Sequence, residues 1–342
     1  MIEQLFAITK NTFLESIRQP IFSVLLIVAS LVLFLNPAVA SYTMDDDNKL
    51  MVDMGLSTLF VAGLLLAAFT ATGVLSTEVE NRTVLTVISK PIPRPLFVLG
   101  KYLGVTLALA VGFWSLTLFF LLTVRHGVMQ RATDTIDPVV MLFGFLAWFF
   151  AIGMAAFGNY YYRWVFTSSF VKILACTLTA AFILMLLINR QWHFQSLAHE
   201  WSKDGSFAQG RLPMVILLIF QAILVLTALA IAASTRLGQL LTLLICCGAF
   251  LLGLASQTTL SPQAISLQWS QLEGFLQHIG WLLARLTYYV LPNLQFFWLA
   301  DTLPQKLAIP AGHLGLLSLY AGLQITALLC LAIALFQSRE VG

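Results

Sequence analysis

Residues 55–76, GLSTLFVAGLLLAAFTATGVLS, form an uninterrupted run of uncharged and mostly apolar side chains. The run is followed directly by residues 77–95, TEVENRTVLTVISKPIPRP, in which acidic, basic and proline residues are mixed. A helix of about 20 apolar residues crosses a ~30 Å hydrocarbon core, whereas a barrel strand would alternate apolar and polar side chains. The two stretches therefore predict a spanning helix followed by a polar segment at the membrane surface.

The composition extends this prediction to the whole chain of 342 residues. Hydrophobic residues make up 59% of it and charged residues only 10%, whereas about 25% of residues are charged in soluble domains. We expect an all-α polytopic membrane protein with a single transmembrane domain, residues 1–342. The net charge of +3 is small and scattered, which argues against a nucleic-acid partner. Charge-free windows predict about eight spans, at 21–40, 55–76, 98–124, 138–159, 168–188, 213–234, 239–255 and 313–336.

The segment 1–19 has the pattern of an amphipathic helix in the membrane interface. Its apolar positions follow helical spacing: Ile2, Leu5, Phe6, Thr9, Phe13 and Ile17. The next run ends in Ala38-Val39-Ala40, which is similar to a signal-peptidase site. A signal peptide begins with a short basic region, whereas the residues before this run are numerous and balanced in charge, so we expect it to stay as the first span.

An even number of spans places both termini on one side, and the distribution of basic residues predicts which side. Basic residues are denser in the segments that share a side with the N-terminus: Lys10, Arg18, Arg82, Lys90, Arg94, Lys101, Arg163, Lys172, Arg236 and Arg339. We therefore expect a multi-pass protein of the inner (cytoplasmic) membrane with both termini in the cytoplasm.

The region 256–312 is predicted to be an extracytoplasmic amphipathic region. Residues 269–290 place apolar side chains on one stripe and residues such as Gln277 and Arg285 on the other. A further crossing near residues 281–299 is the alternative, but Pro292 interrupts it and a charge at a helix centre costs about 2.5–3.5 kcal/mol. We expect an outer helix followed by a short helical or re-entrant piece at 294–303.

Residues 77–95 carry a helix-start pattern, because Thr77 is followed three residues later by Glu80. Apolar side chains then give the expected helix one apolar side, and Pro91, Pro93 and Pro95 end it. A short rigid helix at the cytoplasmic surface can transmit a push. A basic cytoplasmic loop with turn-forming residues is the simpler alternative.

The run E-x-E-N-R-T-x-L-T-x-I-S-K-P-I-P-R at 78–94, with LGKYLG at 99–104, closely resembles the loop after the second span of ABC type 2 permeases. Further similarity lies at 234–238, 250–254, 291–294 and 334–342, and within the family it favours the branch described as permeases of multi-copper enzyme maturation systems. The resemblance implies that this segment is the coupling helix that docks on an ATPase subunit. The coupling residues that it implies are Glu78, Glu80, Asn81, Arg82, Thr83, Leu85, Ile88, Lys90 and Arg94.

The same resemblance implies partners: a cytoplasmic ABC ATPase and a second permease chain, identical or different. It also implies that the N-terminal helix is an elbow helix that braces this assembly. The family core has six spans, so we expect an inserted pair, for which 138–189 is the candidate.

The sequence lacks the phosphate-binding pattern G-x-x-x-x-G-K-[ST] and the zinc-binding pattern H-E-x-x-H. We therefore expect a chain that is not an enzyme and holds no cofactor, with ATP and Mg²⁺ bound by the partner ATPase. The cysteines and histidines lack metal-ligand spacing, apart from a loose pair, His193 and His199, so we expect no metal site. Polar groups buried in the spans are expected to be few, mainly Gln221 and Gln324.

Two local features stay open at this point. Gly100 and Gly104 have the G-x-x-x-G spacing that permits close helix approach, either within the chain or to a second chain. Aromatic residues are dense between residues 113 and 150, where they either line a route for a lipid-like substrate or serve packing and lipid contact.

Two functions follow from these observations. The first is the membrane subunit of an ABC exporter for a hydrophobic or amphipathic substrate, since no central charged cavity is expected. The alternative is an assembly or maturation scaffold, in which ATPase work is transmitted through 256–312 to an extracytoplasmic partner protein.

Overall fold

The computed structural model describes residues 1–42, 47–80, 93–129, 135–202, 206–207, 211–256, 274–303 and 309–337. Seven helices within these ranges are long and apolar enough to cross a membrane. They are α2 (Pro20–Ala40), α3 (Asp47–Glu80), α5 (Arg94–His126), α6 (Pro138–Tyr162), α7 (Phe166–Leu187), α8 (Arg211–Ser234) and α12 (Ala311–Gln337).

The remaining predicted span, 239–255, is the shorter helix α9 (Gln239–Ala255). Its 17 residues measure about 25 Å, slightly less than the ~30 Å core. The seven long helices and α9 confirm a polytopic all-α membrane protein of about eight spans. In the described ranges the only β pairing is an isolated bridge between Ile188 and Phe194.

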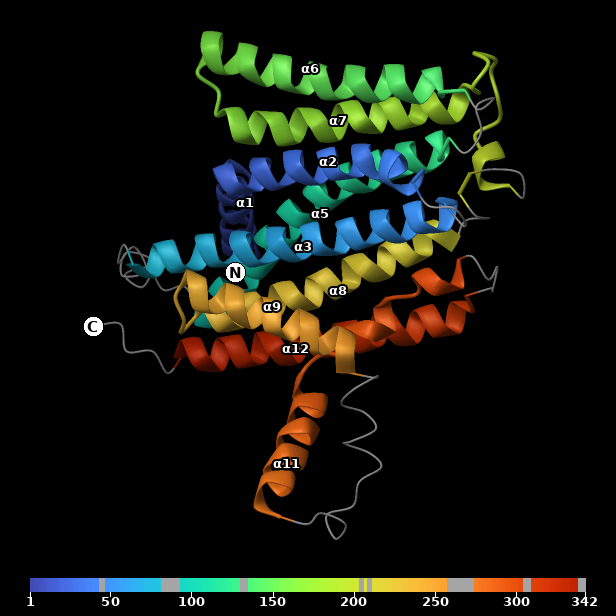
Figure 1. The fold of residues 1–342 in the computed structure, drawn as a ribbon. Coiled ribbons are helices and arrows are strands. Elements are labelled where there is room, and N and C mark those ends of the chain that lie inside the picture. Colours follow the sequence, from blue (N-terminus) through green and yellow to red (C-terminus); the bar gives the residue numbers. More distant parts are fainter. Residues whose placement is uncertain are drawn as a thin grey trace.

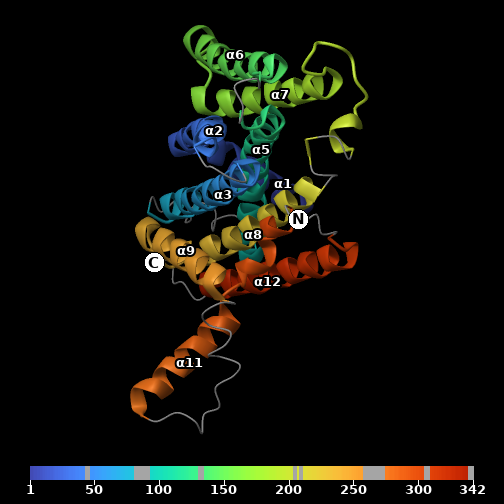
Figure 2. The same ribbon diagram turned by 45° about the vertical axis from the view of Figure 1, so that its right-hand side comes forward.

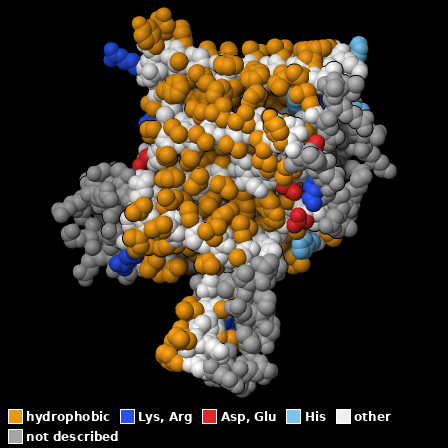
Figure 3. Space-filling view, in the orientation of Figure 1, with side chains coloured by type: hydrophobic (Ala, Val, Ile, Leu, Met, Phe, Trp, Pro, Cys, Tyr) orange, Lys and Arg blue, Asp and Glu red, His pale blue; other side chains and the backbone are white. Residues whose placement is uncertain are grey.

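The spanning helices run side by side, and the start of α1 and the end of α12 lie towards the same end of the bundle, on the left in Figure 1. We call this the proximal end and the opposite one the distal end. Hydrophobic side chains cover the face of the bundle, and the charged side chains in view gather mainly at its two ends (Figure 3). This distribution is the one expected when the helices lie along the membrane normal.

The spans differ sharply in how much of them is buried by protein. In α5 and α8, 67% of the most apolar window is buried, compared with 28% in α6 and 22% in α12. Glycines let the central helices approach closely: a Cβ on Gly55 would lie 2.0 Å from the Phe120 ring, and one on Gly63 would lie 2.1 Å from Ile223. The core therefore centres on α5 and α8, with α6 and α12 at the periphery.

The predicted N-terminal helix is present as α1 (Ile2–Arg18), which crosses the spans near the proximal end (Figure 1). Its small residues Thr9, Thr12 and Ser16 are buried, whereas Ile2 and Phe6 are exposed. Exposed apolar side chains on a helix lying across the bundle suit a position in the membrane interface.

Gly100 and Gly104 of α5 contact α1 within the same chain. A Cβ on Gly104 would lie 2.5 Å from Thr12 Cβ, and one on Gly100 would lie 2.7 Å from Ile8 Cγ2. Between the glycines, buried Lys101 places its Nζ 3.5 Å from Glu15 Oε2 of α1. The G-x-x-x-G spacing thus serves close approach inside the chain, and α1 is fixed to α5 by shape and by charge.

The helix start predicted at Thr77 is wrong, because α3 continues through Thr77 to Glu80. A helix satisfies its own backbone hydrogen bonds, so leaving the apolar run does not by itself end it, and no proline occurs between Asp47 and Pro91. A glutamate three residues after a threonine suits a helix interior as well as a helix start. Residues 81–92 of the predicted coupling segment lie outside the described residues.

In the predicted outer region, α11 (Phe275–Val290) projects sideways from the bundle in both views (Figures 1 and 2). Its apolar residues Phe275, Leu276 and Leu282 are exposed, and Arg285 lies over the Trp281 ring, 4.7 Å from its centre. The short helical piece predicted at 294–303 is two 3-10 turns, η5 (Leu294–Phe297) and η6 (Ala300–Thr302), with Leu294 and Phe297 fully buried. Residues 257–273 and 304–308 of the region lie outside the described residues.

Replacing Gly104 with alanine should destabilise the protein. The added Cβ would lie 2.7 Å from the Thr9 carbonyl oxygen, which is backbone and cannot swing away. Overpacking of this kind costs about 1–3 kcal/mol, more than the roughly 0.5–1 kcal/mol that alanine contributes in a helix interior. We expect a lower thermal unfolding midpoint in detergent. Gly322→Ala on α12, where a Cβ meets no atom within 4 Å, is the control, and equal midpoints for the two variants would contradict this packing.

Candidate functional site

The structure places three of the predicted coupling residues. Glu78 and Glu80 lie in the last turn of α3, and Arg94 is the first residue of α5. Arg94 Nη1 donates to the carbonyl of Gln337, the last residue of α12, at 2.6 Å. The remaining predicted coupling residues lie outside the described residues: Asn81, Arg82, Thr83, Leu85, Ile88 and Lys90.

At the distal end of α5, a cluster of buried charges surrounds Arg125. The Arg125 side chain is only 2% exposed, and its Nε lies 3.4 Å from Asp137 Oδ2 and 3.5 Å from Glu200 Oε1. Asp137 precedes α6, and Glu200 lies in η1 (His199–Trp201) of the connection between α7 and α8. One guanidinium therefore joins three parts of the chain.

The same cluster caps two helix ends. The Arg125 guanidinium donates to the Met185 carbonyl and, at 2.5 Å, to the Ile188 carbonyl at the end of α7. Asp137 Oδ1 accepts from the backbone N–H groups of Val139 and Val140 at the start of α6. These backbone groups have no partner within their helices, so the charges supply the hydrogen bonds that the helix ends lack.

Arg190 and Glu200 complete the cluster towards solvent. Half-exposed Arg190 places Nε 3.4 Å from Asp137 Oδ2, and its Nη2 donates to the Arg125 carbonyl at 2.7 Å. Glu200 accepts from Gln195 Nε2 at 3.0 Å. Burial alone would raise the pKa of the Glu200 carboxyl. The hydrogen bond from Gln195, the Arg125 charge and the bonds from Ser206 outweigh burial, so this pKa lies below its ordinary value.

The expectation that polar groups buried in the spans are mainly Gln221 and Gln324 is wrong, because both are only half-buried whereas Asn36 of α2 and Lys101 of α5 are buried. Gln221 donates to Ser318 Oγ at 2.8 Å. The buried charges Arg125, Asp137 and Glu200 form a separate network outside the predicted spans. All three lie beside or between the predicted spans, where charged residues are expected at the membrane surface. Their closeness depends on how α5, α6 and the connection after α7 pack, and sequence spacing does not encode that.

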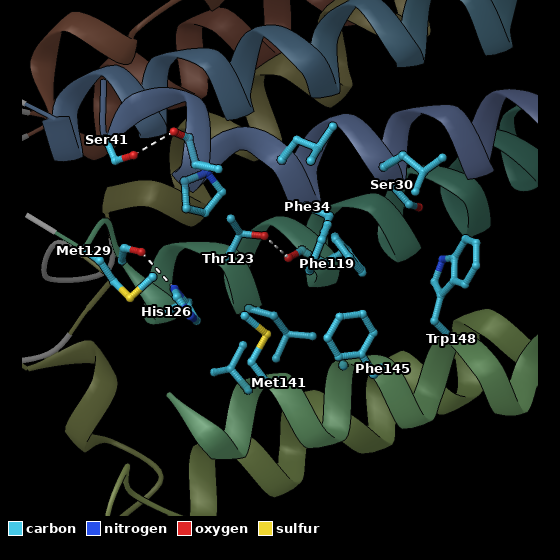
Figure 4. A pocket seen from close by; sticks show the side chains of 18 of the residues that line it. Ser30, Phe34, Ser41, Phe119, Thr123, His126, Met129, Met141, Phe145 and Trp148 are labelled. Atoms are coloured by element: carbon cyan, nitrogen blue, oxygen red, sulfur yellow. Dashed lines mark hydrogen bonds between the residues drawn. The ribbon is translucent and has the colours of Figure 1, made fainter. Parts of the chain in front are cut away.

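Two cavities flank this cluster. A polar cavity of about 290 Å³ lies on its outer side, lined by Arg125, Asn189, Arg190, Gln191, Gln195, His199, Glu200 and Ser206. A larger apolar cavity of about 460 Å³, which we call the distal groove, lies between α2, α5 and α6 (Figure 4). Its volume is within the roughly 300–1,000 Å³ typical of ligand sites.

Aromatic side chains form much of the distal groove. Phe34 of α2 and Phe145 of α6 meet edge to face, with ring centres 5.3 Å apart. Phe119, Trp148 and Phe149 also line it, and all of these except Phe34 belong to the aromatic-rich stretch of the sequence. Phe113 and Phe120 of the same stretch are buried instead. The stretch therefore serves both packing and the wall of a cavity.

The described residues contain no group of three or more His, Cys, Asp or Glu side chains arranged to hold a metal ion. The five histidines are distributed over separate elements: His126 ends α5, His193 and His199 lie after α7, His278 lies in α11 and His313 in α12. The candidate site, as far as the structure describes it, consists of the charged cluster with its hydrogen bonds and the apolar surface of the distal groove.

Replacing Arg125 with methionine should strongly destabilise the distal end. The change leaves Asp137 and Glu200 buried without their main counter-charge, which typically costs about 3–5 kcal/mol. We expect a clear fall in the thermal unfolding midpoint. Lys172→Met, at an exposed position on α7, is the matched control and should leave the midpoint nearly unchanged. Equal midpoints would contradict a stabilising role for the cluster.

The lowered pKa of Glu200 predicts a pH dependence of stability. The stabilisation from the ionised carboxylate is complete above the ordinary glutamate pKa of about 4.3 and is lost as the pH falls through the lower pKa of the folded state. The unfolding midpoint should therefore fall in acid. Glu200→Gln should have a lower midpoint at neutral pH and a shallower decline in acid, and an unchanged decline would exclude Glu200 as a source of the effect.

Comparison with known proteins identifies no family for this fold and site. No model of a protein family matches the chain, and no curated protein matches it. The resemblance to ABC type 2 permeases therefore stays a prediction that rests on the quoted motifs.

Proposed function

We propose that this chain is the membrane subunit of an ABC type 2 exporter, driven by a separate cytoplasmic ATPase and working beside a second permease chain. The observation that supports the proposal is the position of the two ends of residues 78–94, which we call the coupling motif. Glu78 and Glu80 lie in the last turn of α3, and Arg94 begins α5 at the proximal end and bonds to the end of α12.

This position supports transmission along α5. The helix has 33 residues, about 50 Å, and leads from the coupling motif to Arg125 at the distal end. Because Lys101, Gly100 and Gly104 fix α1 to the same helix, a push on the motif would move α1 and α5 as one body. ATP-driven closure of the ATPase would then reach the distal cluster through a packed helix.

The proposed orientation follows from the basic residues. With the proximal end in the cytoplasm of an inner membrane, the coupling motif faces the ATPase and the distal cluster lies near the opposite surface. The chain itself would bind neither ATP nor Mg²⁺, and the apolar distal groove favours a hydrophobic or amphipathic cargo.

A second function would use α11. This helix leaves the bundle between its proximal and distal ends, with Phe275, Leu276 and Leu282 exposed. In this alternative, ATPase work is transmitted to an extracytoplasmic partner during its assembly or maturation. Vesicles with the cognate ATPase should accumulate an amphipathic cargo under the first function. ATPase turnover without cargo, with capture of the partner through α11, would favour the second.

Reversing the charges of Glu80 and Arg82 together should uncouple the ATPase in both cases. Glu80→Lys with Arg82→Glu keeps the net charge and disrupts the contacts expected of the coupling motif. We expect loss of ATPase co-purification and of its stimulation by the permease, with the thermal midpoint retained. The control is the same exchange at Lys203 and Asp204, in the connection between α7 and α8. Unchanged association and turnover in the first variant would refute the proposal.

A further inference from the structure

The distal groove has the length of one membrane leaflet. On α2 it extends from Ser30 to Ser41, roughly 16 Å at 1.5 Å per residue, which is about half of the ~30 Å hydrocarbon core. On α6 it extends from Val140 to Phe149. The groove therefore runs from the distal membrane surface towards the middle of the bilayer.

The distal groove is a cavity of about 460 Å³ that is elongated along the helices. A chain-like molecule fits between the walls formed by α2 and α6, with α5 between them (Figure 4).

The surface end of the groove offers an unused hydrogen-bond acceptor. His126 Nδ1 lies 2.9 Å from the Gly127 carbonyl, which only accepts, so the ring carries its proton there. In the tautomer that carries its proton on Nδ1, Nε2 presents a lone pair, and this buried atom has no partner in the described part of the chain. A buried polar atom of this kind calls for a partner that donates a hydrogen bond.

The position of His126 is held by the charged cluster. It directly follows Arg125, and Arg190 Nη2 donates to its carbonyl at 3.2 Å. The ion pair between Arg125 and Asp137 joins the end of α5 to the start of α6 at the mouth of the groove. The acceptor and the two helices beside it are therefore fixed together.

The deep end of the groove is formed by flat and aliphatic side chains. Trp148, Phe149 and Leu31 line it (Figure 4 labels Trp148). The Trp148 indole N–H also has no partner in the described part of the chain, so the deep end can in addition serve an oxygen atom on the bound chain.

We propose that the distal groove binds a single-chain amphiphile from the adjacent leaflet, with its hydrocarbon chain between α2 and α6 and a hydroxyl of its head group donating to His126 Nε2. This inference deepens the proposed function, in which the same groove favours an amphipathic cargo, by naming the class of ligand and its head-group contact. The geometry of the groove involves neither residues 78–94 nor the proximal end, so binding can be tested without the ATPase.

The proposal can be tested with a photoactivatable monoacylglycerol, in the full-length protein reconstituted into phosphatidylcholine nanodiscs. Cross-linked peptides mapped by mass spectrometry should come from the α2 and α6 walls more than from Leu319 and Leu323, which are exposed on α12. An excess of unlabelled monoacylglycerol should abolish this enrichment. Even labelling of all exposed apolar surfaces would overturn the proposal.

Gly144→Leu fills the groove, because a Cβ at Gly144 has only Leu122 Cδ1 near it, at 3.9 Å. Labelling should fall by about ten-fold, as expected when two methylene contacts are displaced. Gly153→Leu on the same helix, where a Cβ meets no atom within 4 Å, should label as the wild type does. Undiminished labelling of Gly144→Leu would contradict binding in the groove.

The head-group contact is tested with His126→Leu and a second probe. His126→Leu should reduce monoacylglycerol labelling to the level of photoactivatable phosphatidylcholine, which has no hydroxyl donor. If phosphatidylcholine labels the wild-type groove as strongly as monoacylglycerol does, the groove holds ordinary bilayer lipid and the single-chain proposal is wrong. Trp148→Phe keeps the ring and removes the N–H; because the proposal places the head group at His126, this variant should retain most of the labelling.

Discussion

The buried guanidinium of Arg125 is the interaction on which the distal half of the bundle depends. It pairs with Asp137 and Glu200 and donates to carbonyls at the end of α7. Removing a charge from water is costly unless every donor finds a partner, so one arginine orders all the groups around it. The ends of α5 and α7, the start of α6 and the connection to α8 are thereby held in one arrangement.

The central helix α5 connects this interaction to the proximal end of the bundle. At the proximal end α5 begins with Arg94, bonded to the end of α12, and holds α1 through Lys101 and its glycines. At the distal end it carries Arg125 and then His126. A helix packed along most of its length transmits displacement better than a loop does, and α5 joins the proximal end to the distal groove as one such helix.

The predictions from sequence succeeded where a local property decides the structure. Apolar runs long enough to span the bilayer gave the helices, helical spacing gave α1, and the stripe on residues 275–290 gave α11. They failed at Thr77, where a helix-start pattern lies inside α3, and they did not include the buried network of Arg125, Asp137 and Glu200. In both cases the local pattern fits two environments, and neighbouring elements select between them.

Hydropathy alone specifies that these helices enter a membrane, and the motifs at 78–104 specify where a partner ATPase is expected. Which faces meet was decided by packing. The windows of α5 and α12 have nearly equal mean hydropathy, 2.2 and 2.1, yet 67% of one and 22% of the other is buried in protein. Lipid tails are as apolar as leucine, so hydrophobicity does not separate a lipid-facing side chain from a buried one. Small residues and paired charges decide which helix faces are buried in protein. They come together from distant parts of the chain, and their contacts form the charged cluster and the distal groove.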